Sequence, residues 1–230
     1  MTANLEKDPN QISNMFDGVA KNYDLLNDLL SFGQTKRWRR IVTSIISPKP
    51  GMKILDLAAG TGSSSEPLRK KGADVTAADF SEGMLEVGKR KHPNLKFVKA
   101  DALALPFANQ SFDLVTISFG LRNTNDAEKA LNEMHRVTKI NGKLVIVEFS
   151  HPTNKFFRNF YFRYLMKILP LLSRLFAKDS SAYVYLANSI KAWPNQSNLA
   201  KLLMKSGWQD VTWQDLTFGI VAVHIAQRSI

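Results

Sequence analysis

Length, composition and charge already exclude several classes of protein. The chain has 230 residues, contains no cysteine and carries a net charge of +11 with a sequence pI near 9.8. Without cysteine there can be no disulfide, thiolate metal site or cysteine nucleophile. The four histidines show no ligand spacing with carboxylates, so we expect no metal. The positive charge favours an anionic partner, either nucleic acid or an acidic membrane surface.

The length predicts a single domain over residues 1–230, because no linker rich in proline, glycine or serine divides the chain. Within it, residues 1–50 would form an N-terminal helical cap and residues 151–194 an apolar helical insert or lid. The polar N-terminus, MTANLEKDPNQ, lacks the apolar segment of a signal peptide, so we expect a cytoplasmic location.

Short apolar stretches alternate with amphipathic ones along the chain, which is typical of a doubly wound parallel sheet. The parallel strands are expected at residues 53–57, 74–78, 96–99, 112–118 and 143–149. The helices are expected at residues 63–71, 81–91, 125–139 and 196–206, with Ser81 and Asn125 as N-caps. Residues 211–216 and 220–227 would close the sheet as an antiparallel pair, which the dinucleotide-binding variant of this sheet lacks.

The segment KILDLAAGTG, residues 53–62, predicts a buried strand that runs into a glycine turn. Gly60 and Gly62 permit a sharp turn and a close approach of the backbone to a ligand. Asp79 ends the second strand, nineteen residues beyond Gly60, where its carboxylate can accept hydrogen bonds from ribose hydroxyls. The pattern therefore predicts a nucleoside site, and the alternative is that the glycines serve only a tight turn.

The charge of this turn favours a cationic nucleoside over a dinucleotide. Ser65 stands where a third glycine opens the helix in the dinucleotide fingerprint, and Glu66 follows it. Together with Asp56, Glu66 would make the mouth of the turn acidic. S-adenosylmethionine, which carries a sulfonium and an ammonium group, is the ligand that we expect.

Ligands of such a sheet lie over the carboxyl ends of its strands. Asp101 and Ala102 follow the third strand, where a carboxylate and a backbone N–H can meet an adenine ring; Asp101 could equally cap a turn. Ser118 ends the fourth strand, although it could be an ordinary strand hydroxyl. Arg122 and Asn123 follow it and would project into the same cleft, unless they are solvated loop residues.

Two segments resemble the signatures of the menaquinone and ubiquinone biosynthesis C-methyltransferase family, most closely its menaquinone branch. Residues 23–38 are similar to the first signature, with Thr35 where histidine is usual, and residues 136–150 are similar to the second. The resemblance covers almost the whole chain. It implies the class I S-adenosylmethionine-dependent methyltransferase fold, a Rossmann-like doubly wound sheet with an antiparallel C-terminal hairpin. It also implies donor contacts at Thr61, Asp79, Asp101, Ala102 and Ser118.

The resemblance further implies C-methylation of a prenylated quinol ring, demethylmenaquinol to menaquinol, with a ubiquinone-branch benzoquinol as the alternative acceptor. Attack on the sulfonium methyl requires a phenolate, which Arg122 would stabilise. Alternatively, Arg122 would activate a water that takes the proton, with Asn123 in an orienting role. Asp24 and His151 are weaker catalytic candidates. Tyr23 and Asn27 would face the acceptor ring. Tyr185 and the aromatic residues near it in the chain could also line the acceptor pocket.

Two other classes of protein are weighed against this function. An RNA methyltransferase would suit the charge, but the chain has neither the cysteine used for cytosine C5 nor an Asn/Asp-Pro-Pro-Tyr type motif after the fourth strand. A non-catalytic nucleotide-binding module would give no reason for Arg122 and Asn123 beside a cationic donor site. Nucleic acid is therefore not expected as a partner.

The apolar segment KFFRNFYFRYLMKILPLLSRLF, residues 155–176, follows the fifth strand. Its basic residues and Pro170 argue against a membrane-spanning helix. At 100° per residue, Arg163, Lys167 and Arg174 fall on one face, which predicts a basic amphipathic segment. The apolar side chains expected elsewhere are Phe160, Tyr161, Leu165, Ile168, Leu172 and Leu175. Such a segment would hold the protein peripherally at the anionic inner face of the cell membrane, or serve as a lid packed on its own core.

Overall fold

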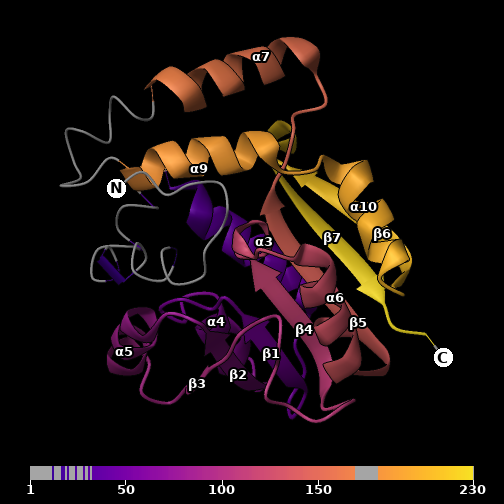
Figure 1. Cartoon of the computed structure of the whole chain (residues 1–230). Coiled ribbons are helices and arrows are strands. Elements are labelled where there is room, and N and C mark those ends of the chain that lie inside the picture. The colour runs from indigo at the N-terminus through magenta and orange to yellow at the C-terminus, as the bar shows by residue number, and fades with distance from the viewer. Residues whose placement is uncertain are drawn as a thin grey trace.

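A seven-stranded sheet is the centre of the computed structural model (Figure 1). The structure describes residues 33–168 and 181–229 and, nearer the N-terminus, Ile12, Asp17, Gly18, Ala20, Asp24, Asp28 and Ser31. The strands are β1 Lys53–Leu57, β2 Asp74–Asp79, β3 Lys96–Lys99, β4 Phe112–Ser118, β5 Thr138–Phe149, β6 Gln209–Leu216 and β7 Val221–Gln227. Their order in the sheet is β3-β2-β1-β4-β5-β7-β6.

The first five strands pair in parallel, whereas β7 pairs antiparallel with both β5 and β6. The carboxyl ends of β1 to β5 therefore meet at one edge of the sheet. This topology confirms the predicted doubly wound sheet with an antiparallel C-terminal pair.

The described helices are α3 Gln34–Ile46, α4 Ser65–Lys70, α5 Glu82–Lys91, α6 Ala127–Val137, α7 Lys155–Arg163, α9 Ser181–Ala192 and α10 Gln196–Lys205. Short helical turns occupy η2 Leu121–Asn123, η3 Tyr164–Ile168 and η4 Thr217–Gly219. Strands β1, β2 and β4 are largely buried on both faces, as parallel strands usually are, whereas the edge strands β3 and β6 are partly exposed. On one face Leu55 packs with Leu131 of α6 and Leu203 of α10, and on the other Ile54 packs with Val42 of α3. Helices therefore cover both faces of the sheet.

Most predicted boundaries agree with the structure within one or two residues, but two expectations are wrong. The fifth strand begins at Thr138 instead of residue 143, because its first residues pair with β4 across a shift in register. The N-cap of α6 is Asp126, whose side chain accepts a hydrogen bond from Lys129 N at 2.9 Å, and not Asn125. A cap must directly precede the first helical residue to reach the third free N–H. Ser81 caps α5 as predicted.

The apolar insert lies beyond the end of β5, where α7 and α9 lie above the sheet in Figure 1. Tyr161 and Leu165 pack against Ile190 of α9. Phe160 is exposed like Arg163, so the expected separation of Phe160 from the basic face is wrong. The side chain of Lys167 and the whole of Arg174 lie outside the described residues. Among the described helices, none has the length and apolar character needed to cross a membrane.

Candidate active site

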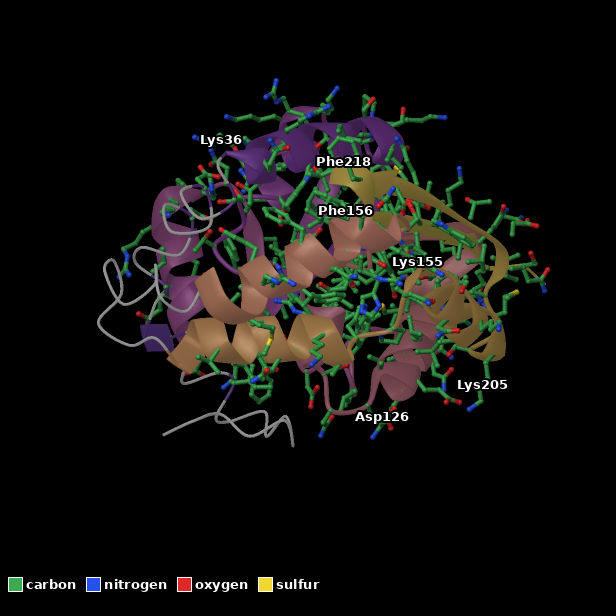
Figure 2. All side chains as sticks on the ribbon, turned by 90° about the horizontal axis from the view of Figure 1, so that it is seen from above. Lys36, Asp126, Lys155, Phe156, Lys205 and Phe218 are labelled. Carbon is green, nitrogen blue, oxygen red and sulfur yellow. The ribbon has the colours of Figure 1, made fainter. Side chains whose placement is uncertain are left out.

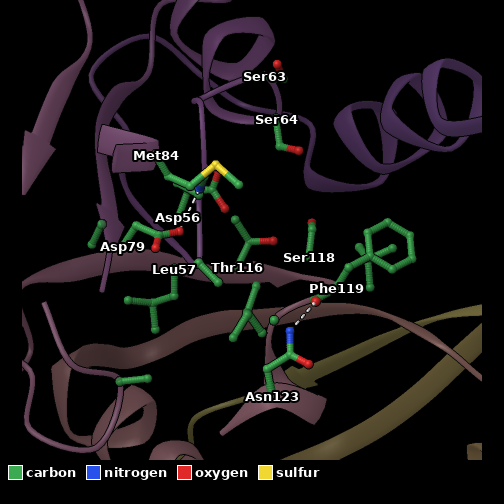
Figure 3. Close-up of a pocket in the computed structure, with 18 of the residues that line it drawn as sticks. Asp56, Leu57, Ser63, Ser64, Asp79, Met84, Thr116, Ser118, Phe119 and Asn123 are labelled. Atoms are coloured by element: carbon green, nitrogen blue, oxygen red, sulfur yellow. Dashed lines mark hydrogen bonds between the residues drawn. The ribbon is translucent and has the colours of Figure 1, made fainter. Parts of the chain in front are cut away.

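A cavity of about 230 Å³ lies over the carboxyl ends of β1, β2 and β4 (Figure 3). Eight of the twelve predicted site residues line it: Asp56, Gly60, Thr61, Asp79, Asp101, Ala102, Ser118 and Asn123. Gly62 and Arg122 are not part of its described lining. Tyr23 and Asn27 lie outside the described residues. Figure 3 shows Asp56 and Asp79 on one side of the cavity, and Phe119 and Asn123 on the other.

The glycine turn after β1 uses its two glycines for different purposes. Both have left-handed backbone angles, φ 56° at Gly60 and 80° at Gly62, which glycine adopts without a steric penalty. A Cβ on Gly62 would lie 2.8 Å from the Phe97 ring, so this residue is required by packing against β3. Gly60 lines the cavity, and because it has no side chain a ligand can approach its backbone closely.

Asp79 connects the glycine turn to the end of β2. Its Oδ2 accepts a hydrogen bond from Gly60 N at 2.7 Å, and its Oδ1 accepts one from Ser81 N at 2.8 Å. Burial raises the pKa of Asp79, and these backbone hydrogen bonds oppose that effect. Each carboxylate oxygen can accept a second hydrogen bond. Asp79 therefore holds the turn in place and still has acceptor capacity toward the cavity.

Asp56, at the end of β1, is a buried carboxyl group that faces the same cavity. Its Oδ2 accepts a hydrogen bond from Ser65 Oγ at 2.6 Å, whereas its Oδ1 has no partner among the described residues. Burial raises the pKa of Asp56 to about 7, with a smaller contribution from Asp79. A cation in the cavity would stabilise the charged form. Ser65, which replaces the third glycine of the dinucleotide fingerprint, thus orients this carboxyl group.

Glu66 does not contribute to the acidity of the cavity, and the expectation that it would is wrong. Its carboxylate is paired with Arg69 through two hydrogen bonds of 2.8 and 2.9 Å, and it is not part of the described lining. Arg69 neutralises Glu66 and lowers its pKa. The acidic end of the cavity therefore consists of Asp56 and Asp79, and Asp24 also belongs to the lining.

Asp24 brings the N-terminal part of the chain onto the glycine turn. Its Oδ2 accepts hydrogen bonds from Thr61 Oγ1 and Lys91 Nζ, each at 2.8 Å. Burial raises the pKa of Asp24, but the hydrogen bonds from Lys91 and Thr61 outweigh it and hold the pKa below its ordinary value. The sequence predicted Asp24 only as a weak catalytic candidate. The structure instead shows a contact that closes one side of the cavity.

Asp101 both lines the cavity and caps the turn after β3. Its Oδ1 accepts a hydrogen bond from Leu103 N at 2.9 Å, which is the capping alternative raised by the sequence. The second carboxylate oxygen remains available as an acceptor. Ala102, its neighbour in the chain, also lines the cavity, as does Ser118 at the end of β4. Asp101 can therefore cap the turn and contact a ligand at the same time.

Arg122 forms a buried ion pair with Glu148, at the end of β5. The two side chains are 6% and 1% exposed, and Arg122 Nη1 lies 2.8 Å from Glu148 Oε1. The same Nη1 donates to Phe119 O at 2.5 Å, and the guanidinium lies 5.2 Å from the centre of the Phe149 ring. Arg122 therefore does not project into the cavity, contrary to the expectation from its place after β4, because Glu148 holds it beneath the strand ends.

Asn123 lines the cavity and links it to the helical insert. Its Nδ2 is 3.5 Å from Phe119 O, the contact drawn in Figure 3, and its Oδ1 accepts a hydrogen bond from Tyr185 of α9 at 3.2 Å. Burial raises the pKa of the Tyr185 hydroxyl, so it remains a neutral donor at ordinary pH. Tyr185 thereby sets the orientation of the Asn123 amide.

An aromatic wall consists of Trp38, Phe119 and Phe149. Trp38 and Phe119 line the cavity, and the ring centres lie 5.9 Å apart for Trp38 and Phe119 and 4.9 Å apart for Phe119 and Phe149. Trp38 Nε1 donates to Thr217 Oγ1 at 2.8 Å. Trp38 ends the first signature segment, Phe149 ends the predicted fifth strand and Phe119 follows the fourth, but the sequence does not show that the three rings meet. The cavity therefore has an acidic end and an aromatic end.

In the part of the chain that the structure describes, no three His, Asp or Glu side chains are grouped so as to hold a metal ion. The residues that line the cavity instead suit a nucleoside with positive charge. They offer the backbone of Gly60, the carboxylate of Asp79 and the unpartnered oxygen of Asp56. With the antiparallel pair at the C-terminal edge, the sheet has the fold of the class I S-adenosylmethionine-dependent methyltransferases.

Comparison with known proteins identifies the family within this class. The model of the ubiE/COQ5 methyltransferase family matches residues 3–228, and the chain belongs to that family. The demethylmenaquinone methyltransferase of Paenarthrobacter aurescens (strain TC1) is 56% identical over 98% of this chain and 89% of the relative. That of Streptomyces griseus subsp. griseus is 53% identical over 99% of both chains.

Solved structures with much lower identity share the fold. A SAM-dependent methyltransferase from Aquifex aeolicus has a TM-score of 0.59 at 18% identity, covering 82% of this chain and 88% of that one. The [4+2]-cyclase SpnF has a TM-score of 0.70 at 15% identity, covering 96% of both chains. Since a cyclase shares the fold, the fold alone does not define the reaction.

Proposed function

We propose that the protein transfers a methyl group from S-adenosylmethionine to a ring carbon of a prenylated naphthoquinol, demethylmenaquinol, and so completes menaquinone. The observation that carries the proposal is the cavity, whose acidic end suits a cationic donor and whose aromatic end suits a flat acceptor ring. Relatives more than half identical over nearly their full length are named for this activity.

At the acidic end, the residues that line the cavity have separate roles in holding the donor. Asp79 would accept hydrogen bonds from the ribose hydroxyls, and Gly60 would allow its backbone to approach the methionine part. Asp101 and the N–H of Ala102 would contact the adenine. Asp56 would face the positive charge of the donor. Thr61, Gly62 and Ser118 complete the proposed donor-binding residues, with Gly62 acting through the shape of the turn.

The donor supplies a methyl group already activated by its sulfonium, so the remaining requirement is a nucleophilic ring carbon. Loss of a proton from one hydroxyl of the reduced quinone places electron density on the neighbouring carbon. The new carbon–methyl bond forms as the sulfur–methyl bond breaks, and the ring carbon then releases its hydrogen as a proton. Alignment of the two substrates can contribute about 7–11 kcal/mol, and assisted proton removal about 10²–10⁴-fold.

We propose Arg122 and Asn123 as the residues that serve the acceptor. The Asn123 amide lines the cavity and would donate a hydrogen bond to the developing phenolate. Arg122 would act from behind it, because its Nη1 holds the Phe119 carbonyl that Asn123 Nδ2 also contacts. Tyr23 and Asn27 stay predicted contacts of the acceptor ring.

We further propose that the enzyme works on the cytoplasmic side, in peripheral contact with an anionic membrane. A prenylated acceptor resides in a bilayer, and α7 presents apolar and basic side chains on one exposed face. A benzoquinol of the ubiquinone branch is the second candidate acceptor, since the aromatic wall would accommodate a single ring as well.

The test is transfer of labelled methyl from S-adenosylmethionine by the purified protein. We expect label in a reduced, short-chain demethylmenaquinol and none in the oxidised quinone or in RNA. Reduced benzoquinol, run in parallel, compares the two acceptor classes. Label in RNA with none in quinol would overturn the function, and equal labelling of the oxidised quinone would overturn the phenolate mechanism.

A further inference from the structure

Three phenylalanines are exposed next to one another on the face above the strand ends. Phe156 is 86%, Phe218 79% and Phe160 61% exposed. Phe156 and Phe160 belong to α7, whereas Phe218 lies in η4, far along the chain. The Phe157 ring of α7 lies 5.4 Å from the Phe218 ring, so the two elements meet at this face. Figure 2 shows Phe156 and Phe218 close together on it. Large apolar side chains grouped in this way mark an interaction surface.

The surroundings of these side chains are basic. Helix α7 carries Lys155, Arg158 and Arg163, and the sequence has no acidic residue from 149 to 178. Basic residues on the polar part of such a surface are attracted to anionic lipid headgroups, while aromatic side chains enter the boundary of the acyl chains. The charge and the apolar groups therefore complement an anionic bilayer.

The backbone of η4 presents Phe218 to solvent at a conformational cost. Thr217, Phe218 and Gly219 have φ angles of 48°, 58° and 85°, which are left-handed, and two of the three are not glycine. Such conformations persist where the surrounding structure imposes them, often at functional sites. Burial of the Phe218 side chain does not explain the left-handed conformation of η4, because that side chain is exposed.

The same turn is connected to the aromatic end of the cavity. Thr217 Oγ1, next to Phe218 in the chain, accepts the hydrogen bond from Trp38 Nε1, and Trp38 lines the cavity. Phe149 lies 6.4 Å from the Trp38 ring and belongs to the aromatic wall. Thr217 thus connects the exposed face to the aromatic end of the cavity, where the acceptor ring is proposed to lie.

We propose that Lys155, Phe156, Phe160, Arg163 and Phe218 form one docking surface for an anionic bilayer, across which the prenylated acceptor passes from the membrane to the aromatic end of the cavity. The inference rests on the proposed function and adds the surface that delivers the acceptor. Phe218 in η4 adds a second part of the chain to this surface. It lies outside the sequence segments that predicted membrane contact or substrate binding.

Sedimentation with phosphatidylcholine vesicles, with and without phosphatidylglycerol, tests the surface. We expect the parent to bind only the anionic vesicles, and Phe218→Ser and Phe156→Ser each to weaken binding about tenfold, the lower range for burying a phenylalanine. Lys155→Gln and Arg163→Gln should each weaken it about fivefold. Met204→Ser is the matched control, because Met204 is 56% exposed on α10, away from this surface, and should bind as the parent does.

Methylation assays separate this inference from the proposed function. Phe156→Ser/Phe218→Ser should methylate a water-soluble, short-chain acceptor at the parent rate, and a long-chain acceptor in anionic vesicles at a much lower rate. If the parent methylates both acceptors but binds no vesicles, or if the double variant matches it on both, the docking surface is wrong while the function stands. A parent dimer that the double variant loses, with no vesicle binding, would also overturn the surface. Failure of the parent on every acceptor would instead refute the function.

Discussion

The buried carboxyl group of Asp56 should give the free enzyme a stability that decreases with pH, and Asp56→Asn should remove this decrease. In the folded protein burial raises the pKa of Asp56 from 3.8 to about 7, assisted by Asp79 and opposed by the hydrogen bond from Ser65 and by the charge of Arg39. At 1.36 kcal/mol per pH unit, that difference corresponds to about 4 kcal/mol as an upper value.

The sign follows from which state binds the proton more tightly. Below about pH 4 the carboxyl is protonated in both folded and unfolded chains, so it imposes no penalty. Between about pH 4 and pH 7 the unfolded chain ionises first, and the folded state loses stability as pH rises. Above about pH 7 the full penalty is present. An asparagine cannot ionise, and its Oδ1 can still accept the Ser65 hydroxyl, whose bond to Asp56 is 2.6 Å long.

Urea denaturation without donor, at about pH 5 and about pH 8, measures the effect. Asp56→Asn should have a higher free energy of unfolding than the parent, and the difference should be larger at the higher pH. It should grow by up to about 4 kcal/mol between pH 4 and pH 8. Binding of the donor should shift the protonation of Asp56 in the opposite direction to burial. Because a cationic donor favours the carboxylate, the parent should release a proton on binding below pH 7, as seen by calorimetry in buffers of different ionisation enthalpy. If Asp56→Asn exceeds the parent in free energy of unfolding by the same amount at both pH values, the reasoning is refuted.

Three further perturbations address the rest of the cavity. Asp79→Ala should weaken donor binding by about 1.5–3 kcal/mol in isothermal titration, the range for lost charge-assisted hydrogen bonds; unchanged affinity in a folded variant would exclude the ribose contact. Arg122→Ala should lower the free energy of unfolding by about 3–5 kcal/mol, because it leaves Glu148 buried and unpaired. Arg122→Met/Glu148→Leu should recover stability in thermal denaturation but not the single-turnover rate, and recovery of both would make the pair structural only. Gly120→Ala should lower the melting temperature, since its Cβ would lie 2.3 Å from the Ala58 Cβ, and an unchanged melting temperature would contradict that clash.

Local patterns predicted the sheet because the central parallel strands are buried on both faces and therefore appear as short apolar runs. Residues 53–57 and 112–118 agree with the observed strands residue for residue. The glycine turn and Asp79 were equally visible, since a left-handed turn and a strand-end carboxylate have fixed spacing along the chain. Eight of the predicted site residues line one cavity for this reason.

Side-chain pairing was much harder to predict, except between neighbours on one helix. The spacing of Glu66 and Arg69 is that of neighbours on a helix surface, so their ion pair was available from the sequence. Arg122 is different, because its partner Glu148 lies twenty-six residues further on and becomes adjacent only when β4 and β5 pair. The position of a residue after a strand end shows where its backbone lies, and long-range pairing decides where its charge points.

The two ends of the cavity are joined by a close contact between the turns that follow β1 and β4. Ala58 and Phe119 are both non-glycine residues with left-handed φ angles, 50° and 57°, and Gly120 is so close to Ala58 that no side chain fits there. Each turn carries one half of the site, since Gly60 follows Ala58 and Asn123 follows Gly120. Strained conformations of this kind cost about 1–3 kcal/mol each and persist only where the surrounding structure imposes them. The packing of the two turns would therefore set the separation of the proposed donor and acceptor sites, which is the quantity that a reaction dominated by alignment requires.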